Sequence, residues 1–159
     1  MADRTFREVL ARFPAGVAVV TAIAPDGRPR GLTVSAFCSV SLRPPMVLVC
    51  VDRSSNTLPA IEHSKGFTVN VLAGGREELA RVFASKRDDK FAGVSWRPAD
   101  PPEMGAILHE DMAAFLACTV AHSIEAGDHW VFIGEVVEAQ QVDEAVHLLY
   151  HRRTFSTVG

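Results

Sequence analysis

The sequence predicts a mainly β protein: an antiparallel β-barrel with few helices, in one domain that spans residues 1–159. Long apolar or alternating segments follow one another with only two or three helical patterns between them. This order favours an antiparallel barrel over a doubly wound sheet. With 159 residues, of which 48% are hydrophobic and 22% charged, the chain is long enough to bury a core and too apolar to be disordered.

Charge and residue spacing argue against several classes of function. The net charge is −3 with both signs mixed along the chain, whereas a nucleic-acid-binding protein carries a basic patch. No apolar run is long enough to cross a bilayer, and the charged first residues lack the apolar region of a secretory leader. Cys38, Cys50 and Cys118 have no CxxC spacing and the histidines no HExxH spacing. We therefore expect no metal site, and buried thiols in a reducing cytoplasm.

A short amphipathic helix is expected at the start of the domain. Thr5 and Glu8 have the spacing of a capping box, in which Thr5 is the N-cap. Pro14 and Gly16 end the helical pattern. The apolar residues of the predicted helix recur at helical spacing and are Phe6, Val9, Leu10 and Phe13.

Two strands joined by a hairpin follow. Residues 16–24 are β-branched and apolar, and Asp26-Gly27 lies at the centre of the next turn. Residues 31–42 then alternate with a period of two, which predicts one half-buried strand. A row of hydroxyls needs partners, which water or a polar ligand along the strand would supply. One face of this strand would carry Thr33, Ser35, Ser39 and Ser41, interrupted by Phe37, and the other Leu32, Val34, Ala36, Cys38 and Val40.

The remaining elements are predicted from periodicity and from turn residues. After the break at Arg43-Pro44-Pro45, residues 46–51 are apolar without alternation, which is typical of a strand buried on both faces. The long charged connection 86–102 is of a kind that is often functional. Further predicted elements are helix 54–64, strand 66–72, helix 76–85 with Leu79, Val82 and Phe83 inward, strands 113–124 and 129–142 joined by a hairpin at 126–128, and a last strand 147–155.

The segment 51–59 is a candidate phosphate site. A buried strand leads into a loop rich in hydroxyl and amide groups, and a helix then begins near Thr57 or Leu58. A helix N-terminus offers free backbone N–H donors and a positive dipole end, which suit a phosphate group. The side chains of Ser54, Ser55 and Thr57 would add further donors. Ordinary N-capping, the alternative, needs only one of these side chains.

The order of several motifs resembles the flavin reductase family. Its members are small reductases with an FMN-binding split barrel, typically the reductase partners of two-component flavin-dependent monooxygenases. The resemblance covers roughly Phe6 to Phe155. One departure is Arg153-Thr154-Phe155, where the family often has a glycine. The matching segments are Thr33-Val34-Ser35-Ala36-Phe37, Ser41-Leu42-Arg43-Pro44-Pro45, Val51-Asp52-Arg53-Ser54-Ser55-Asn56-Thr57, residues 67–72, Asp89-Lys90-Phe91, Gly127-Asp128-His129, residues 133–136 and residues 148–152.

This resemblance implies roles for the matched positions. Thr33, Val34, Ser35 and Ala36 would line the isoalloxazine ring, and Cys50, Val51 and Asp52 would lie beside the flavin. Ser55, Asn56 and Thr57 would hold the ribityl phosphate, with Lys90 and Phe91 on the same side. His129 would position the nicotinamide, with Tyr150 and Arg152 near the same pocket.

The implied function is that of an NAD(P)H:flavin oxidoreductase. Such an enzyme would bind FMN or FAD, take a hydride from NADH or NADPH, and release reduced flavin to a separate monooxygenase, as a cytoplasmic homodimer. Hydride transfer takes place between the two cofactors, so we expect no catalytic side chain beyond the nicotinamide-positioning His129.

Two other functions stay open at this point. One is a flavin-binding carrier or sensor without turnover, which is favoured if His129, Tyr150 and Arg152 point away from the flavin. The other is an enzyme on the same barrel with a different substrate, such as a pyridoxal-type oxidase or a corrin reductase.

Overall fold

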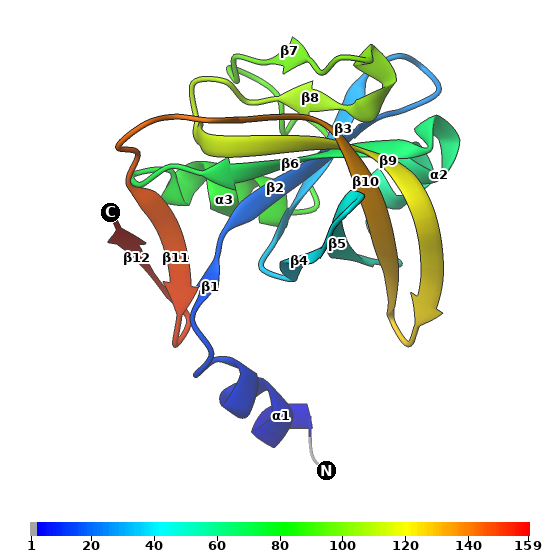
Figure 1. Ribbon diagram of the computed structural model, residues 1–159. Helices are drawn as coiled ribbons and strands as arrows, with labels where there is room; N and C mark the ends of the chain where they lie inside the picture. The colour runs from blue at the N-terminus through cyan, green and yellow to red at the C-terminus, as the bar shows by residue number, and fades with distance from the viewer. Residues whose placement is uncertain (1–2) are drawn as a thin grey trace.

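The computed structural model describes residues 3–159, and most of its regular structure is β-strand (Figure 1). The elements in chain order are α1 (Asp3–Leu10), β1 (Ala15–Gly16), β2 (Ala18–Ile23), β3 (Pro29–Val34), β4 (Phe37–Leu42), β5 (Pro45–Asp52), α2 (Thr57–Ser64), β6 (Gly66–Leu72), α3 (Glu77–Ala84), β7 (Arg97–Pro98), the 3-10 helix η1 (Pro102–Met104), β8 (Ala106–Ile107), β9 (Met112–Ala126), β10 (His129–Gln141), β11 (His147–His151) and β12 (Thr154–Val158).

A seven-stranded antiparallel sheet in the order β3-β2-β6-β9-β10-β5-β4 forms the barrel. Its two edge strands, β3 and β4, are consecutive in the chain. The short connection at Ser35-Ala36 therefore crosses from one edge of the sheet to the other. There the backbone N–H of Cys50 on β5 donates a hydrogen bond to the carbonyl oxygen of Ala36, at 3.1 Å. The predicted antiparallel split barrel is confirmed.

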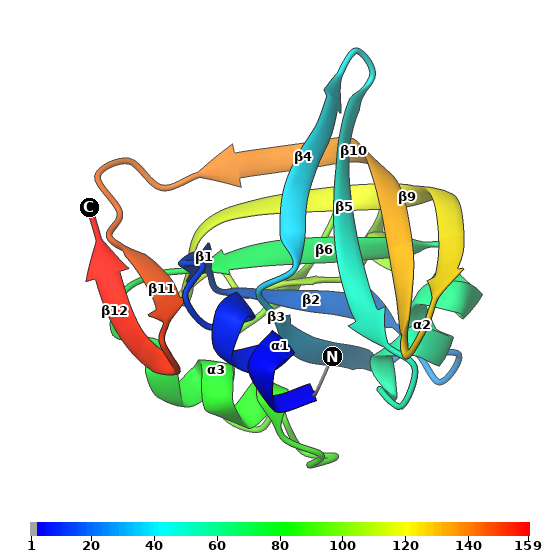
Figure 2. The ribbon, with the colours of Figure 1, turned by 90° about the horizontal axis from the view of Figure 1, so that it is seen from below.

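The prediction of one continuous strand over residues 31–42 is wrong. β3 ends at Val34 and β4 begins at Phe37, on opposite edges of the sheet. The hydroxyl residues consequently do not form one row. The Thr33 hydroxyl donates to the carbonyl oxygen of Ala80 on α3 at 2.7 Å. Cys38 is exposed on the protruding β4–β5 hairpin, so the expectation that it is a buried thiol is also wrong (Figure 2).

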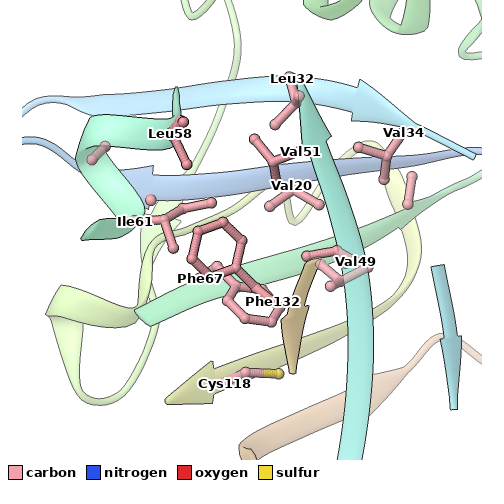
Figure 3. Packing of buried hydrophobic residues seen from close by; sticks show 14 of the residues in the cluster. Val20, Leu32, Val34, Val49, Val51, Leu58, Ile61, Phe67, Cys118 and Phe132 are labelled. Carbon is pink, nitrogen blue, oxygen red and sulfur yellow. The ribbon is translucent and has the colours of Figure 1, made fainter. Parts of the chain in front are cut away.

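The main core fills the barrel, and α2 contributes Leu58, Ala60 and Ile61 to it (Figure 3). β2 and β6 are buried on both faces. In β2, Val20 packs inside the barrel, whereas Val19 packs outside it, in a second cluster with Phe83 of α3. β5, for which burial on both faces was predicted, alternates instead. Its residues Val47, Val49 and Val51 are buried, and the residues between them are half-buried.

Both ends of the chain differ from the predictions. α1 is amphipathic as expected, but it begins at Asp3, so Thr5 lies within the helix and is not its N-cap. None of its residues is buried, and Figure 1 shows it projecting from the barrel. The single last strand is in fact a hairpin of β11 and β12, which turns at Arg152-Arg153 and joins β1 in a small sheet. Within residues 3–159, no helix has the length and apolar character needed to span a membrane.

Candidate functional site

A cavity of about 480 Å³ opens where the chain crosses from β3 to β4. The end of β5, the loop before α2, and the C-terminal end of α3 complete its walls. Its volume is in the range typical of small-molecule sites. The lining residues are Leu32, Thr33, Val34, Ser35, Ala36, Cys50, Asp52, Ser54, Ser55, Asn56, Phe83, Ala84, Ser85, Lys86, Lys90 and His129.

One end of the cavity is polar and held in shape by hydrogen bonds within the loop 52–57. The backbone N–H and the hydroxyl of Ser54 both donate to Oδ1 of Asp52 at 2.7 Å. These two bonds hold the pKa of Asp52 below its ordinary value. The backbone N–H of Thr57, the first residue of α2, donates to the Ser55 hydroxyl at 3.1 Å, so Ser55 partners one of the free N–H groups at the start of the helix.

A positively charged side chain, that of Lys86, lies at this polar end. Nζ of Lys86, on the loop after α3, donates to the Ser54 hydroxyl at 2.9 Å. Asn56, at the N-cap position of α2, makes no side-chain capping bond, and it also lines the cavity. Hydroxyls, an amide and an ammonium group beside a helix N-terminus form a donor set suited to a phosphate.

The rest of the cavity is mainly apolar. The buried Leu32, Val34 and Phe83 line it together with Ala36 and Cys50. Partial burial, and then the nearby Cys38, raise the pKa of the Cys50 thiol, so this side chain stays uncharged at neutral pH. An apolar region beside an end whose donors suit an anion fits a ring system that carries a phosphate.

His129 lies at the start of β10, paired in register with Asp52 at the end of β5. Its Nδ1 donates to Oδ1 of Asp128 at 2.7 Å, and this hydrogen bond lowers the pKa of Asp128. The bond orients the imidazole ring and leaves Nε2 for another partner.

Residues 10–159 match the family described as "Flavin reductase like domain". This chain belongs to that family. Two relatives show how closely: "Flavin reductase (NADH)" of Kitasatospora aureofaciens is 42% identical over 153 residues, which are 96% of this chain and 80% of that protein. "Flavin-dependent monooxygenase, reductase subunit HsaB" of Mycobacterium tuberculosis is 38% identical over 157 residues, which are 98% of this chain and 82% of that protein.

A solved structure of the family has the same fold. The NADH:FAD oxidoreductase SgcE6 of Streptomyces globisporus, in complex with NAD and FAD fragments, superimposes with a TM-score of 0.90 at 34% identity. The match covers 99% of this chain and 93% of that one. The recognition made from the sequence motifs is thus confirmed.

Most residues that the family resemblance assigned to the flavin meet at the cavity. Val51 does not line it, because its side chain points into the barrel core. Thr57 is fully buried, and its hydroxyl has no partner among the described residues. Phe91 packs edge-on against the lining residue Phe83, with ring centroids 5.0 Å apart, and does not itself line the cavity. The predicted residues that do line the cavity are Thr33, Val34, Ser35, Ala36, Cys50, Asp52, Ser55, Asn56, Lys90 and His129.

The two residues predicted near the nicotinamide lie further out. Tyr150 lines an adjoining chamber that shares Thr33, Val34 and Ser35 with the cavity. Arg152 lines neither; its backbone N–H donates to the carbonyl oxygen of Ala11 at 2.7 Å, and its side chain borders an outer surface hollow beside α1.

The side chain of Lys90 connects two elements of the backbone. Its Nζ donates to the carbonyl oxygens of Gly31 and Phe83, both at 3.0 Å, and so links β3 to α3. Burial, and then the nearby Lys86, lower the pKa of Lys90.

Sequence reasoning did not select Lys86, which is the lysine that faces Ser54. The only local signal was the Lys86-Arg87 pair directly after a predicted helix. Phe83, Ala84 and Ser85 were missed in the same way, because only the packing of α3 on the barrel brings them to the cavity. Residues 3–159 contain no cluster of three His, Cys, Asp or Glu side chains that could hold a metal ion.

Proposed function

We propose that the protein, as one domain of residues 1–159, is an NAD(P)H:flavin oxidoreductase that binds FMN or FAD in the cavity beside α2. One observation carries the proposal: in a chain of this family, the apolar part of the cavity meets a polar end with hydroxyls, an amide and the Lys86 ammonium group. The isoalloxazine ring fits the apolar region, and the ribityl phosphate fits the polar end.

The residues of this chain then act by binding and orientation. Thr33, Val34, Ser35 and Ala36 border the ring, and Ser54, Ser55 and Asn56 together with Lys86 bind the phosphate. Bound flavin and nicotinamide supply the hydride chemistry themselves, so the protein needs no acid or base at the reacting atoms. His129, held by Asp128, lines the cavity and positions the nicotinamide there.

The partner of the reductase is a separate flavin-dependent monooxygenase, which receives reduced flavin by diffusion. A relative that carries the name of a monooxygenase reductase subunit supports this role. Three free cysteines and no disulfide among residues 3–159 are compatible with the cytoplasm as the location.

We further propose a homodimer. Phe6, Val9, Leu10 and Phe13 on and after α1 are exposed, with Phe13 at 75%, and a second copy would cover them. Sedimentation velocity should give a dimer for the natural protein and a shift toward monomer for Phe13→Asp. A monomeric natural protein at micromolar concentration would rule the dimer out.

The test of function is the loss of NADH absorbance in air with catalytic protein and added FMN or FAD. Oxidation that saturates with flavin supports the reductase. The absence of turnover, combined with a change of flavin fluorescence on mixing, would instead support a flavin-binding carrier. The same assay with NADPH decides which nicotinamide is preferred.

A further inference from the structure

The turn of the β9–β10 hairpin, which leads into His129, lies beyond the end of the neighbouring strand β5. β5 ends at Asp52, which is paired in register with His129, so the ladder between β5 and β10 stops before the turn residues Gly127 and Asp128. Every residue from 121 to 128 is exposed, so the core does not hold this end of the hairpin either. Contacts from outside the two strands therefore decide where the turn lies.

Arg53, the residue directly after β5, supplies such contacts. Its backbone N–H donates to the carbonyl oxygen of Asp128 at 3.0 Å. Its Nη1 donates to the carbonyl oxygen of Gly127 at 3.2 Å and to Oε1 of Glu125, which is also its ion-pair partner. Nη1 carries two protons, one for each of these acceptors. One residue thus fastens the hairpin turn to the end of β5, beside which Figure 2 shows it.

The neighbours of Arg53 in the loop 52–57 belong to the polar end of the cavity. Asp52 and Ser54 line the cavity and are hydrogen-bonded to each other, and Ser54 also accepts the bond from Lys86. Arg53 itself is not part of the lining. The loop therefore contacts the cavity through Asp52 and Ser54, and the hairpin through Arg53.

The contribution of the Arg53 side chain to overall stability is expected to be small. The side chains of Arg53 and Glu125 are 47% and 54% exposed, and water weakens such a pair. Removal of the Arg53 side chain should accordingly loosen the turn and leave the barrel folded.

We infer that Arg53 is a positioning residue for hydride transfer, which holds the β9–β10 turn against the loop 52–57 and so fixes where the His129 imidazole lies. The inference rests on the proposed function, which gives His129 its role toward the nicotinamide. Asp128 orients the ring of His129, whereas Arg53 fixes the backbone that carries both residues. A small displacement of a positioning group is enough to impair a reaction that needs two ring systems in contact.

The first test compares nicotinamide with flavin binding. Arg53→Ala should raise the KM for NADH about fivefold through misplacement of His129, and should change the Kd for FMN by less than about twofold. Arg53→Lys should stay within about twofold of the natural KM, because an ammonium group can donate to the same two acceptors. An unchanged KM for NADH in Arg53→Ala, an equal rise in both constants, or no recovery with lysine overturns the inference.

A double-mutant cycle tests whether Arg53 acts through His129. Residues that act as a unit have non-additive effects. Once His129→Ala is present, Arg53→Ala should therefore change the KM for NADH by less than about twofold. The same rise in both backgrounds would mean that Arg53 acts independently of His129, against the inference.

Arg97→Ala is the matched control. Arg97 forms an ion pair with Glu138 of β10 at 3.5 Å, its side chain is 44% exposed, and it does not line the cavity. This variant removes a similarly exposed ion pair on the same strand and should leave the KM for NADH unchanged. A rise equal to that of Arg53→Ala would show a general effect of lost ion pairs and would overturn the inference.

Hydrogen exchange of the free protein tests the positioning without flavin, nicotinamide or turnover. The amides of residues 125–129 should exchange about two- to fivefold faster in Arg53→Ala than in the natural protein, and those of 147–151 at the same rate. Arg97→Ala should exchange like the natural protein at 125–129. Equal exchange at 125–129 in Arg53→Ala and the natural protein overturns the inference. Failure of the natural protein to reduce any flavin refutes the proposed function, whereas hydrogen exchange still decides whether Arg53 holds the hairpin.

Discussion

The ammonium group of Lys86 lies 2.9 Å from the hydroxyl oxygen of Ser54, although 32 residues separate them in the chain. This contact joins the loop after α3 to the loop before α2 and places a positive charge at the polar end of the cavity. We therefore predict that Lys86→Ala raises the KM for FMN about tenfold, because a charged hydrogen bond to the phosphate is lost. Steady-state NADH oxidation at varied FMN concentration measures the effect.

Two controls test whether the effect comes from the phosphate. Arg87→Ala removes the neighbouring charge, whose side chain instead bonds Asp89 at 2.8 Å, and it should leave the KM for FMN unchanged. Riboflavin has no phosphate, so its KM should be the same with Lys86 and with Ala at this position. An equal rise for riboflavin and FMN would show that Lys86 supports the loop and does not bind the phosphate.

His129 tests the nicotinamide side. His129→Ala should raise the KM for NADH by more than it raises the Kd for FMN, because the imidazole lines the cavity and is proposed to contact the nicotinamide and not the flavin. Asp128→Asn should act in the same direction but less strongly, since it only loosens the 2.7 Å bond that orients the ring. Equal losses in NADH and FMN binding would make His129 a structural residue of the hairpin.

The sequence predicted the elements whose signals are local. Helical periodicity identified α3, and the inward positions of Leu79, Val82 and Phe83 are confirmed by their packing in the second cluster, which lies outside the barrel. The Asp26-Gly27 turn and the long β9–β10 hairpin were likewise correct. Each of these depends on residues close together in the chain, so periodicity and turn residues suffice.

Features that depend on distant contacts were not predictable. Ser35 and Ala36 carry no turn signal, and the strand breaks there because closure of the barrel brings Ala36 to Cys50. The turn at Arg152-Arg153 lacks the Gly or Asn that marks such hairpins, so the last two strands were read as one. Recognition of the family motifs, in contrast, located most of the cavity lining.

The buried thiol of Cys118 gives a prediction about pH. Burial raises its pKa to about 12, from 9.0. The unfolded thiol ionises from about pH 9 upward while the native thiol keeps its proton, so this group's contribution to stability falls as pH rises between those values.

In the native protein at pH 8, a thiol reagent should modify the exposed Cys38 first and Cys118 only after unfolding. Peptide mass spectrometry gives the order, and early labelling of Cys118 would contradict it.

Gly134 on β10 tests the packing of the barrel. A Cβ atom at this position would lie 2.6 Å from Cζ of Phe67 and 2.7 Å from Cβ of Cys118, both in the core. Gly134→Ala should lower the free energy of unfolding by about 1–3 kcal/mol through overpacking. Gly16→Ala is the matched control, because no described heavy atom lies within 4 Å of its added Cβ. Urea unfolding compares the two, and equal stability would mean that the barrel packs differently around Phe67.

A flavin bound in this cavity should be reduced by a nicotinamide. The deciding measurement mixes FMN or FAD with a molar excess of NADH and catalytic protein in the absence of oxygen, and follows the visible absorbance of the flavin. The whole flavin pool should be bleached over many turnovers, and Lys86→Ala should slow this at low FMN but not at saturating FMN. Bleaching no faster than in the same mixture of NADH and flavin without protein would show that the protein is not a flavin reductase.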